Sequence, residues 1–197
     1  GTWLRRAELR GFLDTVPERV VVVVDEAYFE YVEERDYPNT IAWLAHYPNL
    51  VSARTFSKIY GLAGLRVGYG VSSLDVADLL NRVRQPFNVN SIAQAAAVAA
   101  LADDDHLKKA RRANTDGMRQ LVKGFEHLGL PFIPSVGNFV CVEVGDAEQV
   151  YEQLLHAGVI VRPVANYGMP NHLRVTVGLP DENERFLRAL EIAARGK

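Results

Sequence analysis

The sequence contains one cysteine, no excess of charge of either sign and no apolar run long enough to cross a membrane. Cys141 cannot form a disulfide within the chain, which suits a reducing cytoplasm. The 22 basic and 24 acidic side chains leave a net charge of −2, so no basic stripe for nucleic acid is expected. The valine run at 20–24 is far shorter than a bilayer requires. We therefore expect a cytoplasmic protein whose partners are small molecules or other protein chains.

The composition is that of a globular protein. With 197 residues, of which 48% are hydrophobic, the chain can bury a core and form one domain or two small ones. It starts at Gly1 without an initiator methionine, and its first residues show no charged-then-apolar signal pattern. This start leaves open that the sequence is part of a longer chain.

The first half of the sequence switches repeatedly between helical and strand patterns. Helical spacing of apolar residues predicts a helix at 4–16, and the following valine run predicts a strand that is buried on both faces. Two more strands are predicted at 49–53 and 66–71, with helices at 40–46, 73–84 and 91–101. Strands that alternate with helices indicate an α/β unit with a mostly parallel sheet.

The second half predicts a different arrangement. Three consecutive acids at 103–105 favour the start of a helix that continues to about Leu128, where Gly129 ends it. The segments that follow predict a small α+β unit, with strands at 139–144, 159–161 and 173–177 and helices at 147–157 and 181–194. We place the boundary before the long helix, which gives domains at 1–102 and 103–197.

A first candidate site follows the valine strand, where Asp25 and Glu26 precede Tyr28. Open α/β sheets bind ligands at the carboxyl ends of their strands. A carboxylate there can hold Mg²⁺ in a nucleotide hydrolase, pair with a protonated ring nitrogen of a cofactor, or cap the next element. The chain contains no G-x-x-x-x-G-K-[ST] motif, which is evidence against the hydrolase.

A second candidate site follows the strand at 49–53. The hydroxyls of Thr55 and Ser57 and the guanidinium of Arg66 can together bind a phosphate, and Lys58 lies among them. Glycines in this segment allow the backbone to approach a ligand closely. The five histidines show no spacing that suggests a metal site, so we expect none.

These segments resemble the cofactor-binding core of fold-type I pyridoxal-phosphate (PLP) aminotransferases, with Asp25-x-x-Tyr28, Thr55-Phe56-Ser57-Lys58 and Arg66. The second half resembles the end of histidinol-phosphate aminotransferases, in the segments at 136–140, 161–163, 167–168 and 173–178. The match covers essentially the whole chain. It implies part of a large PLP-binding domain, with a mostly parallel sheet and helices on both faces, followed by a small α+β domain.

The resemblance implies a role for each of these residues. Lys58 binds the cofactor aldehyde and shuttles a proton, Asp25 pairs with the pyridine nitrogen, and Tyr28 donates to the 3′-oxygen. The cofactor phosphate is held by Thr55, Ser57 and Arg66. Arg174 matches the family's substrate-anion arginine, Arg162 resembles a second anion contact, and Asn138 either lines the pocket or satisfies strand-end backbone.

The implied reaction converts histidinol phosphate and 2-oxoglutarate into imidazole-acetol phosphate and glutamate. An aromatic aminotransferase or a related PLP decarboxylase is an alternative, as is a PLP-sensing domain without catalysis. Members of the resembled family are about twice as long and form homodimers, and Gly1-Thr2 resembles the end of their N-P-T-G segment. The resemblance therefore implies that an amino-terminal half is absent, and that this segment alone is inactive.

Overall fold

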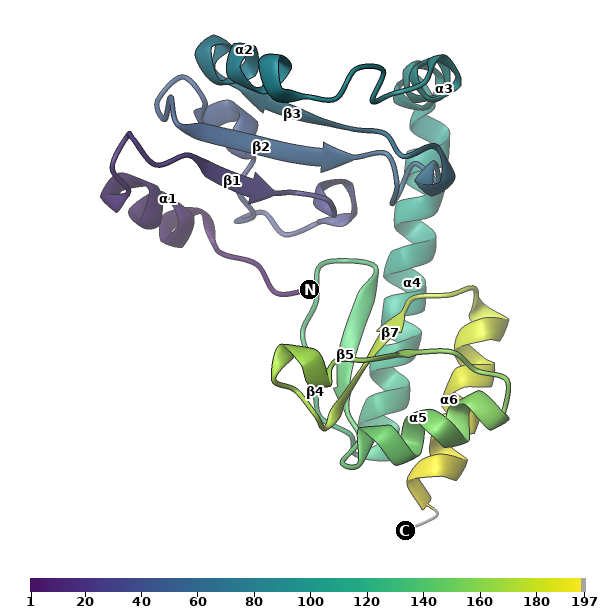
Figure 1. The fold of residues 1–197 in the computed structure, drawn as a ribbon. Coiled ribbons are helices and arrows are strands. Elements are labelled where there is room, and N and C mark those ends of the chain that lie inside the picture. The colour runs from purple at the N-terminus through teal and green to yellow at the C-terminus, as the bar shows by residue number, and fades with distance from the viewer. Residues whose placement is uncertain (196–197) are drawn as a thin grey trace. The chain divides into compact units, whose positions relative to one another are not determined.

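The computed structural model describes residues 1–195, which form two compact units (Figure 1). The first unit comprises residues 3–108. The second unit comprises Gly1–Thr2 and the chain from Lys109 onward. The units meet in sequence inside the helix α4 (Asp104–Leu128), which begins in the first unit and continues into the second. The domain boundary at 102/103 remains a prediction.

The first unit contains a three-stranded sheet in the order β1-β2-β3. Its elements along the chain are α1 (Arg6–Thr15), β1 (Val22–Asp25), the 3₁₀ helices η1 (Phe29–Tyr31) and η2 (Thr40–Trp43), β2 (Leu50–Thr55), η3 (Ala63–Leu65), β3 (Gly68–Ser72), α2 (Leu74–Val83) and α3 (Ser91–Leu101). The predicted strands are present with shifted ends. A 3₁₀ helix replaces most of the helix predicted at 40–46.

The sheet of the first unit is mixed, whereas the sequence predicted a mostly parallel one. Strands β1 and β2 are parallel, but β3 runs antiparallel to β2. The connection at 56–67 contains only the short η3, and a parallel return would need a longer crossover, usually with a helix. The α/β class itself is confirmed.

The prediction that the valine strand is buried on both faces is wrong for this chain. Val22 and Val24 pack with Leu9 and Leu13 of α1 in one apolar cluster. The other side is open: Val23 remains 61% exposed. Helix α1 covers only the face that carries Val22 and Val24, and no described residue covers Val23 to the same extent. The apolar run alone does not reveal which faces are covered.

The second unit contains an antiparallel sheet in the order β4-β5-β7-β6, with helices packed on it. After α4 come β4 (Phe132–Ile133), β5 (Phe139–Glu143), α5 (Ala147–His156), β6 (Arg162–Pro163), the 3₁₀ helix η4 (Ala165–Tyr167), β7 (His172–Thr176) and α6 (Pro180–Arg195). The strand predicted at 159–161 is wrong. Pairing with β7 starts only at Arg162, one residue further on.

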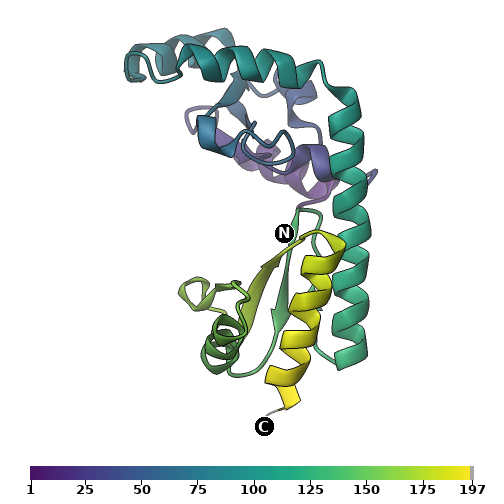
Figure 2. The same ribbon diagram turned by 90° about the vertical axis from the view of Figure 1, so that its right-hand side faces the viewer.

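One hydrophobic core holds the second unit together. Phe125 of α4 contacts Phe186 of α6 edge to face, and Figure 2 shows these two helices side by side. Both belong to a cluster that also contains alternate residues of β5 and β7, such as Val140, Val142 and Leu173. This alternation is what a sheet with a single covered face requires. The small α+β unit predicted from the sequence is therefore present.

Gly117 lets α4 approach the loop after β7 closely. A methyl group at this position would lie 2.5 Å from Cγ1 of Val177 and 3.2 Å from the carbonyl oxygen of Gly178. The second contact is with backbone, which cannot rotate away. In contrast, a methyl group on Gly11 in α1 would have no neighbour within 4 Å.

Gly117→Ala is therefore expected to lower the free energy of unfolding by about 1–2 kcal/mol, because overpacking outweighs the gain in helix propensity. Gly11→Ala is the control and is expected to raise it by up to about 1 kcal/mol. Urea unfolding followed by circular dichroism measures both. A Gly117→Ala variant as stable as Gly11→Ala would contradict the close packing.

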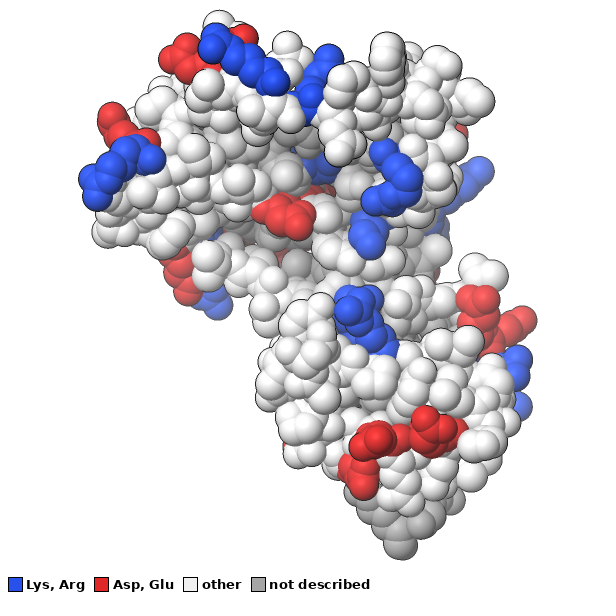
Figure 3. Space-filling view, in the orientation of Figure 1, with Lys and Arg blue, Asp and Glu red and all other residues white. Residues whose placement is uncertain are grey.

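The surface carries both signs of charge. On the face shown in Figure 3, basic and acidic side chains are interspersed. None of the helices in residues 1–195 has the length and apolar character needed to span a bilayer.

Candidate active site

Asp25 is the last residue of β1, and its side chain is exposed. Its Oδ1 accepts a hydrogen bond from the backbone N–H of Ala27 at 3.0 Å, so the capping interpretation describes a contact that is present. A carboxylate has about four lone-pair sites, and this contact uses one of them. The carboxylate can therefore cap the turn and also accept a hydrogen bond from a donor group of a ligand.

Lys58 lies in the turn that follows β2. The neighbouring side chains of Phe56, Ile59 and Tyr60 are buried, while the lysine side chain is exposed. Its Nζ lies 5.3 Å from the centroid of the Tyr28 ring, so the structure brings together the lysine and the tyrosine predicted from the two motifs. Buried neighbours hold the backbone of this turn, and they leave the amine accessible for chemistry.

The residues predicted to bind phosphate are also close together. Nη1 of Arg66 donates to Oγ of Ser57 at 3.3 Å and to the carbonyl oxygen of Ala63 at 2.9 Å. Oγ1 of Thr55 accepts from the backbone N–H of Ser57 at 3.0 Å. Arg66 has φ 52° and ψ 52°, a left-handed conformation that is rare for residues other than glycine and asparagine. Such strain is typical of functional positions.

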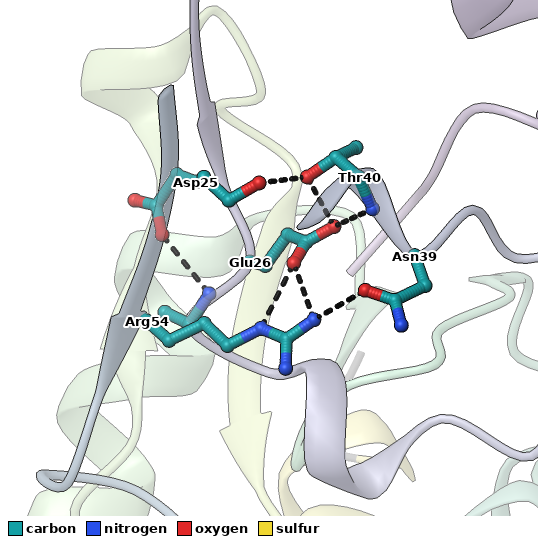
Figure 4. A network of polar contacts seen from close by, with 7 residues as sticks. Asp25, Glu26, Asn39, Thr40 and Arg54 are labelled. Carbon is teal, nitrogen blue, oxygen red and sulfur yellow. Dashed lines mark hydrogen bonds and ion pairs between the residues drawn. The ribbon is translucent and has the colours of Figure 1, made fainter. Parts of the chain in front are cut away.

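A buried polar network lies beside these residues (Figure 4), and the sequence analysis missed it. Glu26 is 1% exposed and forms an ion pair with Arg54 of β2 at 2.9 Å. The carboxylate also accepts hydrogen bonds from the backbone N–H and the hydroxyl of Thr40. The available sequence signal is an acid and a base at the ends of two neighbouring strands. Their pairing depends on the strand register.

Tyr37 lies close to this network. Burial raises the pKa of its phenol to about 12, and the negative charge of Glu26 adds to the increase. The positive charge of Arg54 acts in the opposite direction. The Tyr37 phenol is therefore a neutral hydrogen-bonding group throughout the physiological pH range.

His106, in the first turn of α4, is a second residue that the sequence analysis missed. Its Nε2 lies 2.9 Å from the carbonyl oxygen of Ile59, the residue after Lys58. Because a carbonyl only accepts hydrogen bonds, Nε2 must carry the proton in this contact. The histidine thus ties the lysine turn to α4, although 47 positions separate it from Ile59 in sequence.

The residues predicted to bind substrate belong to the second unit. Arg162 and Arg174 are directly opposite each other on β6 and β7. Like charges opposite each other on neighbouring strands destabilise a sheet unless an anion compensates for them. Within the described residues, neither arginine forms an ion pair, and the buried Nε of Arg174 has no hydrogen-bond partner. This arrangement is suited to binding an anion.

The surroundings of the two arginines fix their direction. The guanidinium of Arg174 lies 4.9 Å from the centroid of the Phe139 ring, and Nη2 of Arg162 donates to the hydroxyl of Tyr167 at 3.3 Å. Asn138 precedes Phe139, and its carbonyl oxygen accepts from the N–H of Val177 at 2.9 Å. This bond uses the backbone of Asn138 and not its side chain, so the role of the Asn138 side chain remains a prediction.

The described part of the chain contains no group of three or more histidine, cysteine, aspartate or glutamate side chains that could hold a metal ion. The structure brings the amine of Lys58 close to the phenol ring of Tyr28 and the guanidinium of Arg66 close to the hydroxyl of Ser57.

An accessible lysine amine can form a covalent bond with an aldehyde, and a guanidinium with hydroxyls beside it can bind a phosphate. Residues 1–190 match the sequence profile of the family described as aminotransferase class I and II. The chain belongs to this family. The match contradicts the nucleotide-hydrolase alternative.

Similar proteins support this assignment. The chain is 61% identical to histidinol-phosphate aminotransferase 1 of Nitrosococcus oceani, over 97% of this chain and 52% of that protein. It is 62% identical to histidinol-phosphate aminotransferase 2 of Pseudomonas fluorescens, over 100% and 54%. The crystal structure of histidinol-phosphate aminotransferase from Sinorhizobium meliloti in complex with pyridoxal-5′-phosphate is 33% identical, with a TM-score of 0.90, over 99% of this chain and 54% of that one. The chain spans about half the length of these relatives.

Proposed function

We propose that this chain is part of a PLP-dependent aminotransferase of histidine biosynthesis. The reaction converts histidinol phosphate and 2-oxoglutarate into imidazole-acetol phosphate and glutamate. The observation that carries this proposal is the cluster at the end of the first sheet, where the exposed Lys58 amine lies over Tyr28 and near the Ser57–Arg66 pair. The names of the relatives at 61% and 62% identity support the choice of reaction.

The residues of the cluster fit PLP in chemical type. A primary amine is required for the aldehyde, and Lys58 supplies it on an accessible side chain. A dianionic phosphate needs a charged fork and hydroxyl donors, which Arg66, Ser57 and Thr55 supply. The strained backbone of Arg66 directs its guanidinium to the Ser57 hydroxyl, so the anion site is formed before any ligand binds.

The cofactor, when bound, accepts the electron pair that is released when the substrate α-carbon loses a proton. We assign the proton transfer to Nζ of Lys58. The neutral amine would take the proton from the substrate α-carbon and then pass it to the cofactor. Asp25 holds a proton on the ring nitrogen by charge pairing. The Tyr28 phenol donates to the 3′-oxygen and orients the ring.

The substrate anions are assigned to Arg162 and Arg174. The two guanidinium groups lie on adjacent strands and have no acidic partner among residues 1–195, so they suit the phosphate of histidinol phosphate and the carboxylates of glutamate in turn. Asn138 is a further candidate for the pocket wall, because it directly precedes the strand that carries Phe139.

The test uses the full-length protein that contains this chain, loaded with PLP. With histidinol phosphate and 2-oxoglutarate, glutamate is expected to form, and borohydride reduction is expected to fix the cofactor on Lys58. Glutamate formed only from aromatic amino acids would indicate an aromatic aminotransferase, and release of carbon dioxide a decarboxylase. Binding of PLP without turnover of any donor would indicate a sensing domain.

We also propose that the full-length protein is a cytoplasmic homodimer and that the 197-residue segment does not catalyse the reaction alone. The relatives are about twice as long, so the remaining half of such a protein is available to complete the pocket. The same assay performed on the segment is expected to yield no glutamate.

A further inference from the structure

We propose that the buried ion pair of Glu26 and Arg54 positions Asp25 and Thr55 for the cofactor, an inference that rests on the proposed function. Glu26 directly follows Asp25 at the end of β1, and Arg54 directly precedes Thr55 at the end of β2. The pair therefore connects two neighbouring strand ends, and each of these ends carries one proposed cofactor contact. Neither member of the pair binds the cofactor itself.

The carboxylate of Glu26 is fixed by four contacts. Its Oε2 accepts a hydrogen bond from Nε of Arg54 at 2.9 Å and forms an ion pair with Nη2 of Arg54, also at 2.9 Å. Its Oε1 accepts from the backbone N–H of Thr40 at 3.0 Å and from the Thr40 hydroxyl at 2.8 Å. With the side chain 1% exposed, water does not compete for these contacts, and the carboxylate has one orientation.

The guanidinium of Arg54 is held equally firmly. Besides Glu26, its Nη2 donates to Oδ1 of Asn39 at 2.9 Å. Its Cζ lies 3.6 Å from the centroid of the Phe29 ring, so the guanidinium stacks on an aromatic ring. Phe29 and Asn39 both come from the connection between β1 and β2. The pair therefore fixes this connection as well as the two strand ends.

Side chains alternate between the two faces of a strand, so the ion pair of Glu26 and Arg54 on one face also determines where the neighbouring side chains point. Asp25 is exposed and Glu26 is buried, and Figure 4 shows their carboxylates pointing to opposite sides. The N–H of Glu26 donates to the carbonyl oxygen of Ala53 at 2.8 Å, which continues the β1–β2 ladder past Asp25. Because Glu26 and Arg54 are fixed on one side, Asp25 and Thr55 are directed to the other.

A role in stability alone does not account for this arrangement. Taking two charges out of water costs about as much as their attraction returns, and a pair of apolar residues often stabilises a fold equally well. What apolar residues do not provide is a forked contact with one defined geometry. Positioning and stability can therefore be separated by experiment.

The experiment compares variants of the full-length protein in two measurements: thermal unfolding without cofactor, and the dissociation constant of PLP from an absorbance titration. The central variant is the double substitution Glu26→Gln with Arg54→Met. The glutamine keeps an oxygen for the Thr40 donors, and the methionine removes the charge that Glu26→Gln alone would leave unpaired. We expect unfolding close to that of the parent protein, but PLP binding weaker by about ten-fold or more.

Tyr47→Phe is the matched control. It removes a hydrogen bond of 2.6 Å from the Tyr47 hydroxyl to Asp14 in the same unit, away from the strand ends. We expect it to lower the unfolding temperature and leave PLP binding unchanged. If the double variant binds PLP as tightly as the parent protein, or if binding only follows stability across all variants, the positioning role is refuted. If the parent protein itself binds no PLP, the proposed function fails, and this inference fails with it.

Discussion

Lys58→Ala is expected to abolish transamination by the full-length protein, with a fall in rate of about 10⁴-fold or more. Alanine cannot form the covalent bond with the cofactor aldehyde, and it cannot carry the proton between the two carbon atoms that exchange it. Both functions disappear with one side chain. The fold is expected to remain, because the side chain is exposed and its buried neighbours Phe56, Ile59 and Tyr60 are unchanged.

The measurement is glutamate formation, together with the visible absorbance of the bound cofactor before and after borohydride. Lys108→Ala serves as a control, because Lys108 is an exposed lysine of the same unit that forms an ion pair with the exposed Asp105. It is expected to retain full activity. Turnover by Lys58→Ala at a rate similar to that of the control would show that another group moves the proton.

Asp25→Asn is expected to lower kcat by about a thousand-fold while PLP still binds. An ion pair near a protein surface is worth about 4 kcal/mol, which corresponds to about three orders of magnitude in rate if it acts only in the transition state. Asparagine retains an oxygen that can accept from the N–H of Ala27, so the turn after β1 is preserved. The substitution therefore isolates the charge from the cap.

Steady-state kinetics and a PLP titration measure the two effects separately. Asp75→Asn is the control, because Asp75 is an acid in the first turn of α2 at another place in the same unit. An unchanged kcat in Asp25→Asn would leave Asp25 with the capping role alone. If PLP affinity and kcat fall by similar factors in Asp25→Asn, the charge of Asp25 also stabilises the bound cofactor before the reaction begins.

Much of the fold could be predicted from the sequence, because local patterns determine helices and strands directly. The helical spacing before Pro17 predicted α1, and the acids at 103–105 predicted the start of α4. The antiparallel direction of β3 could not be predicted from the pattern. The antiparallel direction follows from the connection between β2 and β3, which contains no crossover helix. The spacing of apolar residues in that connection does not show whether it forms a helix.

The candidate site divides in the same way. Asp25 and Lys58 could be named as candidates, because Asp25 ends the valine strand and Lys58 lies three residues after β2, each in an identifiable motif. The contacts that surround them could not be found, because they depend on register. Glu26 meets Arg54 only because β1 pairs with β2 in one particular alignment, and His106 reaches Ile59 across 47 positions. A single sequence places an acid and a base near the ends of two strands, but it does not give the register that pairs them.

The left-handed backbone at Arg66 also matters for protein engineering. Glycine would adopt φ 52° there without strain, so a search for stabilising substitutions would favour replacing this arginine. That replacement would relax the turn and, under the proposed function, remove the cation that binds the cofactor phosphate. At this position glycine would favour stability, whereas the proposed activity requires arginine. Stabilising substitutions should therefore be made at other positions, for example Gly11, where an added methyl group has no neighbour within 4 Å.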